Sequence, residues 1–245
     1  LITKKTKAVV VINTYGNISD ISNIRNFLKK KNIYMIEDSA ESLGSKYKTN
    51  FAGSYGDIST FSFHATKNIT TGEGGMILTN NKRIAKKISL YRSHGVDKKR
   101  YYHHLHGHNF RLSNLLAAVG YSQSLRMKSI IQKRKNIYQQ YLKNIDLKLI
   151  NIQKLDNKDI VPWTFAFTVK RNNIHKLKNF LDKNNIETRN GFYSASHLKI
   201  FNIKKNKFVN SDYLSKNVIC LPFFLEISKS EISYICDKIN NFLVN

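Results

Sequence analysis

The fold prediction starts from one stretch of sequence, residues 61–76, which reads Phe61-Ser62-Phe63-His64-Ala65-Thr66-Lys67-Asn68-Ile69-Thr70-Thr71-Gly72-Glu73-Gly74-Gly75-Met76. It begins as the end of an apolar strand, places Lys67 in a loop rich in hydroxyl groups, and closes on a Gly-Glu-Gly-Gly turn. A lone lysine is usually a solvated surface residue. In this setting Lys67 is instead a candidate for a lysine that forms a Schiff base with a carbonyl compound.

The segment upstream of this stretch predicts a strand, a helix and a second strand. The β-branched run at residues 8–12 has no polar alternation, which favours a strand covered on both faces. Ser19 and Asp20 are possible N-caps of a helix that extends to about Leu28, and a strand at residues 33–36 ends at Glu37-Asp38. This order is typical of a right-handed crossover in a parallel sheet, where ligands bind beyond the carboxyl ends of the strands. Asp38 stands at such an end.

The remaining pattern predicts two domains. After residues 58–63 and 76–79, which read as strands, come a helix at about 82–91, a polar loop at 95–108, and helices from about 113 and 129. Residues 163–169 then alternate like a strand with one buried face, and Ser228 with Glu231 forms a capping box for a last helix. We therefore expect an α/β domain at residues 1–130 and a small α+β domain at residues 131–245.

Charge raises the possibility of nucleic-acid binding. The 245-residue chain carries 41 Lys and Arg against 16 Asp and Glu, a formal net charge of +25, and clustered basic residues bind phosphate backbones. Here the lysines are spread along the whole chain, with no stripe of basic and aromatic residues and no nucleic-acid motif. We expect no dedicated nucleic-acid partner, although a diffuse positive field would attract an anionic substrate.

Composition gives no sign of a membrane segment or a metal site. No apolar run approaches the roughly 20 residues that span a bilayer, and the short run at residues 8–12 does not resemble a signal peptide, so we expect a cytosolic protein. Cys220 and Cys236 lack a CxxC spacing and are expected to be buried thiols. Several histidines lie in or beside the polar loop without a carboxylate or cysteine at a defined spacing, which favours a mobile loop over a metal site: His94, His103, His104, His106 and His108.

Asp38 and Lys67 together indicate pyridoxal phosphate. This cofactor needs a lysine that holds it covalently, and a carboxylate that keeps its pyridine nitrogen protonated so that the ring accepts electrons. The opposite charge raises the pKa of that nitrogen. Each residue alone has a plainer explanation, a turn residue for Asp38 and a surface lysine for Lys67. Their combination at the ends of neighbouring strands, beside the Gly-Glu-Gly-Gly turn, favours the cofactor.

These motifs resemble the DegT/DnrJ/EryC1/StrS family of sugar aminotransferases. The resemblance covers nearly all of the chain and rests on these segments: Glu37-Asp38-Ser39-Ala40-Glu41-Ser42-Leu43-Gly44, Gly56-Asp57, the stretch at 61–76, Asn109-Phe110-Arg111-Leu112-Ser113-Asn114, and residues 217–223. It implies a type I pyridoxal-phosphate-dependent aminotransferase fold, comprising part of the large, mostly parallel-sheet domain and the small C-terminal domain. It also implies a homodimer with shared active sites.

The resemblance assigns roles to residues by position. Lys67 corresponds to the Schiff-base lysine, Asp38 to the pyridine partner and Ser62 to a phosphate ligand. Glu41 takes a cofactor-contacting position, where glutamate resembles perosamine-type enzymes that aminate C4 of a nucleotide-linked 4-keto-6-deoxy sugar. Asn109 corresponds to a residue that reaches the phosphate of the partner subunit's cofactor. Four assignments remain weaker: Arg111 beside that phosphate or a substrate anion, His64 lining the site, and Tyr193 and His197 near the sugar.

The implied reaction is amine transfer from an amino acid, taken to be glutamate, to a nucleotide-linked keto sugar for polysaccharide or glycan biosynthesis. Lys67 would act as general base and acid. Family chains are longer at the N-terminus, where a helix cradles the cofactor phosphate, so we expect this chain to be a truncated product that binds pyridoxal phosphate weakly and transaminates poorly. Two alternatives stay open: an inactive or regulatory relative, and a basic nucleic-acid-binding protein.

Overall fold

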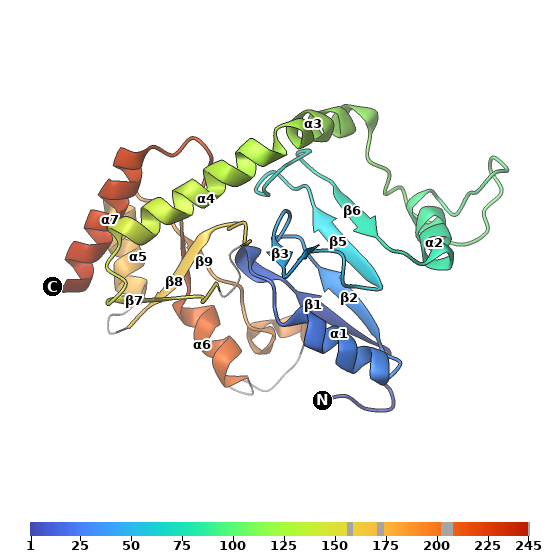
Figure 1. Cartoon of the computed structure of the whole chain (residues 1–245), viewed down its shortest axis with the longest axis horizontal. Coiled ribbons are helices and arrows are strands. Elements are labelled where there is room, and N and C mark those ends of the chain that lie inside the picture. Colours follow the sequence, from blue (N-terminus) through green and yellow to red (C-terminus); the bar gives the residue numbers. More distant parts are fainter. Residues whose placement is uncertain (156–158, 171–173, 202–207, 245) are drawn as a thin grey trace. The chain divides into compact units, whose positions relative to one another are not determined.

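The computed structural model describes residues 1–155, 159–170, 174–201 and 208–244 and divides the chain into two compact units (Figure 1). Unit 1 comprises Leu1–Ile131 with Asn157–Val161, and unit 2 comprises Gln132–Asp156 with Pro162–Asn245. The division falls within the long helix α4 (Met127–Asn144). Within the described ranges, no helix combines the length and apolar character that crossing a bilayer requires.

Unit 1 is built on a four-stranded sheet with the order β1-β2-β5-β6. β1 (Ala8–Ile12), β2 (Tyr34–Asp38) and β5 (Ile58–Ser62) are parallel, and α1 (Ile21–Lys30) connects the first two. The predicted strand–helix–strand crossover is therefore confirmed. The fourth strand, β6 (Gly75–Leu78), pairs antiparallel with β5, which is possible because the loop between them folds back without a crossover helix.

The two faces of this sheet differ in burial. Met35 and Val11 point to one side and are buried, whereas Val10 and Ile12 on the other side are 55% and 62% exposed. The prediction that β1 is covered on both faces is therefore wrong for the described residues. Helix α1 packs on the sheet, contacts β2 and buries Ile21 and Leu28. Because alternate residues of a strand point to opposite faces, a cover on one face buries only every second side chain.

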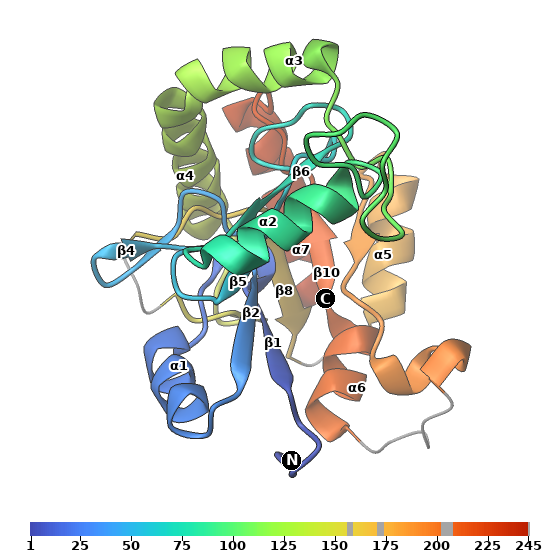
Figure 2. The same ribbon diagram turned by 90° about the vertical axis from the view of Figure 1, so that its right-hand side faces the viewer.

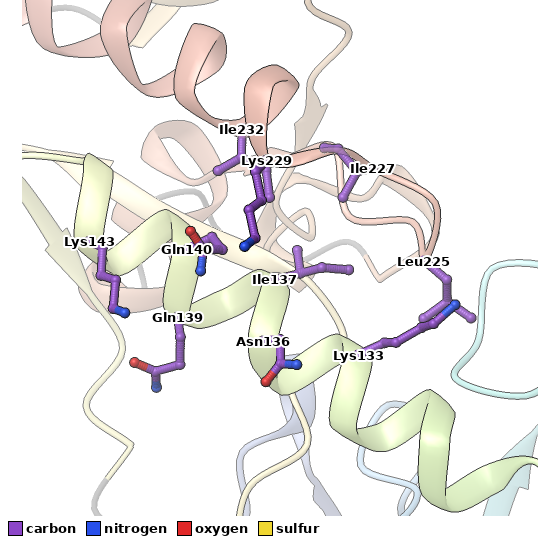
Figure 3. Close-up of a pocket in the computed structure, with 10 residues that line it drawn as sticks. All are labelled: Lys133, Asn136, Ile137, Gln139, Gln140, Lys143, Leu225, Ile227, Lys229 and Ile232. Atoms are coloured by element: carbon purple, nitrogen blue, oxygen red, sulfur yellow. The ribbon is translucent and has the colours of Figure 1, made fainter.

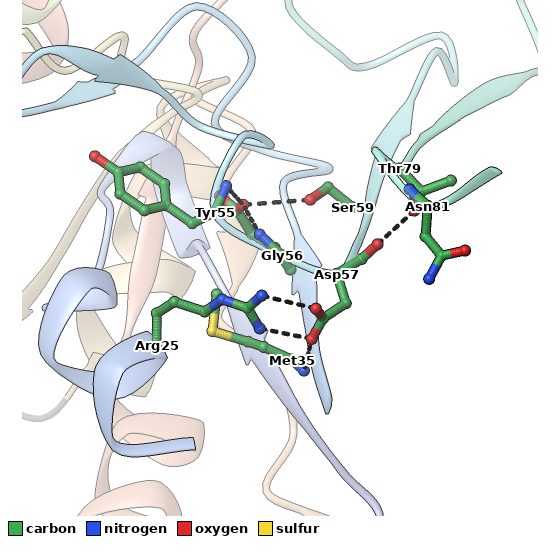
Figure 4. Close-up of polar contacts among 9 residues, drawn as sticks. Arg25, Met35, Tyr55, Gly56, Asp57, Ser59, Thr79 and Asn81 are labelled. Atoms are coloured by element: carbon green, nitrogen blue, oxygen red, sulfur yellow. Dashed lines mark hydrogen bonds and ion pairs between the residues drawn. The ribbon is translucent and has the colours of Figure 1, made fainter. Parts of the chain in front are cut away.

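An ion pair ties α1 to the start of β5. The two terminal guanidinium nitrogens of Arg25, Nη1 and Nη2, donate to Asp57 at 2.6 and 2.7 Å, and Asp57 Oδ2 also accepts the backbone N–H of Met35 at 2.8 Å (Figure 4). The hydroxyl of Thr79 donates to the carbonyl oxygen of Asp57 at 2.6 Å. The arginine holds the pKa of the Asp57 carboxyl below its ordinary value. Asp57 thus connects the helix and the neighbouring strand through its side chain, and the segment after β6 through its backbone carbonyl.

The rest of unit 1 carries short or exposed elements. They are the 3-10 turn Thr14–Gly16, the hairpin of β3 (Lys46–Tyr47) and β4 (Asn50–Phe51), α2 (Lys82–Arg92) and α3 (Asn114–Leu125). The predicted N-cap Ser113 is confirmed, since its hydroxyl accepts the N–H of Leu116. Asp20 occupies the N-cap position of α1 but its carboxylate bonds the side chains of Asn23 and Tyr47 instead of a backbone N–H.

Unit 2 contains an antiparallel sheet with the order β7-β8-β10-β9. Its strands are β7 (Ile150–Ile152), β8 (Phe165–Val169), β9 (Arg189–Asn190) and β10 (Ile219–Leu221), and Figure 2 shows β8 and β10 side by side. The helices are α5 (Ile174–Lys183), α6 (Val209–Asn217) and α7 (Lys229–Val244), with 3-10 turns at Ala195–His197 and Lys199–Phe201. Unit 2 therefore combines an antiparallel sheet with separate helices, which is an α+β arrangement.

Aromatic and aliphatic side chains fill the core of unit 2. Tyr141 of α4 is fully buried, with its ring centroid 4.9 Å from that of Phe165, and its hydroxyl donates to the carbonyl of Pro222 at 2.7 Å. Cys220 and Cys236 are both buried, as predicted. The predicted capping box at the start of α7 is confirmed, because Ser228 Oγ accepts the N–H of Glu231 while Glu231 accepts the N–H of Ser228.

Candidate active site

The carboxyl ends of β2 and β5 bring two of the predicted site residues to one edge of the sheet. Asp38 is the last residue of β2 and pairs with Thr60 of β5, and Ser62 ends β5 two positions further on. Side chains two positions apart in a strand share a face, so Asp38, Thr60 and Ser62 stand on the same side. Asp38 Oδ1 accepts the N–H of Ala40 at 3.1 Å, which holds the carboxylate where the strand turns.

Lys67 and Glu41 meet beyond that edge. The ammonium nitrogen of Lys67 lies 3.5 Å from Glu41 Oε1, and the side chains are 15% and 9% exposed. Glu41 Oε2 accepts the backbone N–H of Tyr15 at 2.9 Å. Tyr15 has a left-handed backbone with φ 59°, a conformation uncommon for a residue with a side chain, and this turns its N–H toward the carboxylate. The glutamate therefore links the loop after β1 to the loop after β5.

Electrostatics joins Asp38 to this pair. Burial raises the pKa of the Glu41 carboxyl above its ordinary value, while the Tyr15 N–H and the Lys67 ammonium act against that rise and the Asp38 carboxylate adds to it. Both Asp38 and Lys67 are thus close enough to Glu41 for their charges to act on it. The structure brings together these three predicted residues: a partly buried amine and two carboxylates.

The loop that presents Lys67 is held by backbone bonds to the end of β5. Phe63 donates its N–H to the carbonyl of Gly74 at 2.8 Å, and its own carbonyl accepts from the N–H of Thr71 at 2.9 Å. Gly74 has φ 155°, and a Cβ there would lie 2.5 Å from Thr71 Oγ1 and 2.9 Å from a methyl of Leu112. Within the Gly-Glu-Gly-Gly turn, Gly74 is therefore a position where the loop closes too tightly for a side chain.

A residue that the sequence reasoning missed, Glu37, organises the segment beneath this edge. It is fully buried and its two carboxylate oxygens accept hydrogen bonds from six groups: Asn13 Nδ2, Ser39 Oγ, Ser59 Oγ, and the backbone N–H groups of Gly53, Tyr55 and Gly56. A buried carboxylate is stable only when such partners surround it. The sequence contained a signal for this role: Glu37 precedes Asp38 in a strand, so its side chain must point to the opposite face, toward the interior.

The other predicted residues of unit 1 are half-buried or exposed. Ser62 is half-buried and its hydroxyl accepts the N–H of His64 at 3.3 Å, whereas the His64 ring is exposed and faces Glu73 at 3.7 Å. Asn109 and Arg111 are exposed. No described contact joins either of them to Asp38, Glu41 or Lys67. Their predicted role toward a partner subunit therefore stays a prediction.

In unit 2, Tyr193 and His197 have different surroundings. Tyr193 is 65% exposed. His197 is mostly buried, with Nε2 3.5 Å from Asp212 Oδ1 and Nδ1 3.3 Å from Ser215 Oγ. Hydrogen bonds from Ser194 and Ser196 lower the pKa of the Asp212 carboxyl, and burial acts against that shift. Among the described residues, no group of three or more His, Cys, Asp or Glu side chains is arranged to hold a metal ion.

Known proteins resemble this chain in sequence over most of its length. The sequence profile of the DegT/DnrJ/EryC1/StrS aminotransferase family matches residues 1–240. GDP-perosamine synthase of Escherichia coli O157:H7 is 36% identical over 98% of this chain and 67% of that protein. The pleiotropic regulatory protein of Geobacillus stearothermophilus is 28% identical over 98% of this chain and 66% of that protein.

The fold has a counterpart among solved structures. The Helicobacter pylori aminotransferase PseC, involved in the biosynthesis of pseudoaminic acid, superposes with a TM-score of 0.93 over 100% of this chain and 68% of PseC, at 24% identity. The predicted fold is therefore confirmed: the α/β chain matches part of the type I pyridoxal-phosphate-dependent aminotransferase structures. By its matched profile and its similarity to GDP-perosamine synthase, the chain belongs to the DegT/DnrJ/EryC1/StrS aminotransferase family, which uses pyridoxal phosphate.

Proposed function

We propose that this chain carries the lysine side of an aminotransferase site that transfers an amino group, taken from glutamate, to a nucleotide-linked keto-deoxy sugar. The observation that carries the proposal is that Lys67 lies 3.5 Å from Glu41, a buried carboxylate on which the charge of Asp38 also acts. Membership of a sugar aminotransferase family and the similarity to GDP-perosamine synthase support the substrate class.

The residues present fit pyridoxal phosphate by the chemistry of the donor set. A primary amine, a carboxylate at a strand end and a hydroxyl at the end of the neighbouring strand share one edge of the sheet. Lys67 Nζ would hold the cofactor covalently, the Asp38 carboxylate would pair with the ring nitrogen, and Ser62 would bind the phosphate. When bound, pyridoxal phosphate supplies an aldehyde carbon and an electron-accepting ring.

The chain's own residues then handle the proton. Lys67 Nζ, once neutral and free of the cofactor, takes a proton from the substrate carbon that carries the nitrogen and later returns one, as a general base and acid. Glu41 orients that amine, because its second oxygen is held by the Tyr15 N–H and its first faces Nζ. Partial burial of both side chains limits the water that competes for these contacts.

Subunit pairing and the remaining contacts are part of the same proposal. We expect a homodimer in which Asn109 and Arg111 of one copy reach the phosphate side of the other copy's site, since both side chains are exposed. Tyr193 and His197 are proposed sugar contacts, with His64 lining the site. Residues 1–130 would form the cofactor-binding part and residues 131–245 the small domain.

Borohydride reduction in millimolar pyridoxal phosphate, followed by peptide mass spectrometry, tests the proposal. We expect Lys67 to be labelled ahead of the other lysines, and the Asp38→Asn variant to show weaker labelling. Lys67→Ala should lose that label and any amine transfer, whereas Lys29→Ala, an exposed lysine at the end of α1, should change neither. Labelling spread evenly over the surface lysines would reject the proposed site.

A regulatory function is the second candidate, because the pleiotropic regulatory protein is similar over nearly the whole chain. A regulator need not turn over a substrate. Lys67→Ala distinguishes the two candidates: it should abolish amine transfer by an enzyme and leave the binding of a regulatory partner unchanged.

A further inference from the structure

A cavity lies in unit 2, between α4 and the segment that leads into α7. It has a volume of about 510 Å³ (Figure 3), within the range of about 300–1,000 Å³ typical of small-molecule sites. From α4 come residues spaced three or four apart on one side of the helix, among them Lys133, Ile137 and Gln140. Lys229 extends from the start of α7 toward Gln140. Two helices thus form opposite walls.

The cavity combines an apolar floor with a basic rim. Ile137, Ile227 and Ile232 are all nearly or fully buried and form the apolar part of the lining. The polar part consists of three lysines and three carboxamides, which are Lys133, Lys143, Lys229, Asn136, Gln139 and Gln140. Among the described residues that line it, none is a carboxylate. The lining therefore suits a ligand with one apolar and one anionic part.

The three ammonium groups have no anionic partner within the chain as described. No ion pair to a described carboxylate involves Lys133, Lys143 or Lys229. The two carboxylates on either side of Lys229 in the sequence act elsewhere: Glu231 accepts two hydrogen bonds from Ser228, and the charge of Glu226 acts on Arg134. Like charges around one cavity repel each other, and a bound anion would relieve that repulsion.

The start of α7 adds to the positive field. Its capping box uses the N–H groups of Ser228 and Glu231, while Lys229 and Ser230 occupy the first turn, where backbone N–H groups have no partner in the helix. The dipole of this 16-residue helix places partial positive charge at the same end. We propose that this cavity binds an organic phosphate of nucleotide size, with the phosphates on the lysines and the apolar part on the isoleucines.

Titration of the ¹⁵N-labelled chain with ADP, followed by amide chemical shifts, tests the proposal. We expect saturable shifts confined to residues 133–143 and 225–232. Pyrophosphate should bind there more weakly because it lacks a group for the apolar floor, and adenosine should not bind because it has no charge. Affinity for ADP should fall as salt rises.

A matched pair of triple variants separates the cavity from the general charge of the chain. Lys133→Gln with Lys143→Gln and Lys229→Gln should weaken ADP binding at least about tenfold, as expected when charge-assisted contacts are lost. Lys176→Gln with Lys183→Gln and Lys216→Gln removes the same charge from exposed positions of unit 2 and should leave the affinity unchanged. If the first triple variant does not fold, Lys229→Gln alone provides the same comparison.

Three results would overturn the proposal. ADP at millimolar concentration could shift no amide in the two segments, or the two triple variants could lose affinity equally. Adenosine or pyrophosphate could also bind there as tightly as ADP, which would show that the cavity does not require a ligand with both an anionic and an apolar part.

Discussion

Lys67 Nζ lies 3.5 Å from Glu41 Oε1, and the other oxygen of that carboxylate accepts the N–H of Tyr15. The glutamate is therefore held from one side by a backbone loop and faces the amine from the other. Burial raises the pKa of its carboxyl despite both contacts. Ionised Glu41 is therefore less favourable in the folded chain than in the unfolded chain, and its carboxylate lies beside the amine that the proposed reaction uses.

Glu41→Gln should make the fold more stable at neutral pH while weakening cofactor labelling of Lys67. The folded-state pKa of Glu41 is raised, so ionisation favours the unfolded chain, and wild-type stability should fall as the pH rises past the ordinary value of 4.5. Glutamine removes that dependence. Urea unfolding followed by circular dichroism between pH 4 and 7 measures the difference, which should close at the acid end. A variant less stable than wild type at pH 7 would contradict the expectation.

Glu37→Gln should loosen the segment that follows β4. An amide NH₂ in place of either oxygen would face N–H and O–H donors that now donate to the carboxylate, and unsatisfied buried groups cost about 1–3 kcal/mol. We expect faster hydrogen exchange at Gly53, Tyr55 and Gly56, whose N–H groups now bond Glu37. The control is Glu187→Gln, at an exposed position of unit 2. Equal protection in both variants would show that the six contacts do not stabilise the segment.

Arg25 and Asp57 should be coupled in a double-mutant cycle. A partly buried, two-pronged pair is worth more than an exposed ion pair, so Arg25→Met and Asp57→Asn should show a coupling of about 1 kcal/mol. The pKa of Asp57 is depressed in the folded state. Its stabilisation is therefore present above the ordinary value of 3.8 and is lost as the pH falls through the folded-state pKa. Urea unfolding of the four proteins at pH 7 and near pH 3 measures the coupling energy and its loss in acid. A cycle with no coupling at pH 7 would show that the Arg25–Asp57 pair does not stabilise the fold.

Gly74→Ala should destabilise the Lys67 loop more than Gly72→Ala does. Both glycines have positive φ, 155° and 79°, but a Cβ at position 72 meets open space, whereas one at position 74 meets Thr71 and Leu112. Positive φ is unfavourable for alanine at either position, by about 1–3 kcal/mol, and the close contacts at position 74 should add about 1–3 kcal/mol. Hydrogen exchange of the Phe63 and Thr71 amides reports the loss. Equal effects of the two substitutions would mean that the neighbours of Gly74 move aside freely.

Much of the local structure could be predicted because it depends on neighbours in the chain. The capping box of Ser228 and Glu231, the cap at Ser113 and the strand that ends at Asp38 all depend on groups within a few residues. The Gly-Glu-Gly-Gly sequence likewise predicted a tight turn after Lys67. The family motifs placed Asp38 and Lys67 in one site before any geometry was known.

Other features were decided only in three dimensions. The antiparallel direction of β6, the exposed face of Val10 and Ile12, and the six donors around Glu37 depend on which distant segment packs where. The same holds for Glu41, whose partner Lys67 is 26 residues away.

Residues 61–76 by themselves indicated that Lys67 follows the end of a strand and precedes a tight, glycine-rich turn. Both follow from local backbone sterics and from the alternation of side chains along a strand. Tertiary structure decided what the lysine meets. Sheet register sets Asp38 level with Thr60, and the left-handed turn at Tyr15 aims an N–H at Glu41, so the amine faces a held carboxylate. Coulombic and hydrogen-bond partners act through space, and only the packed sheet places them.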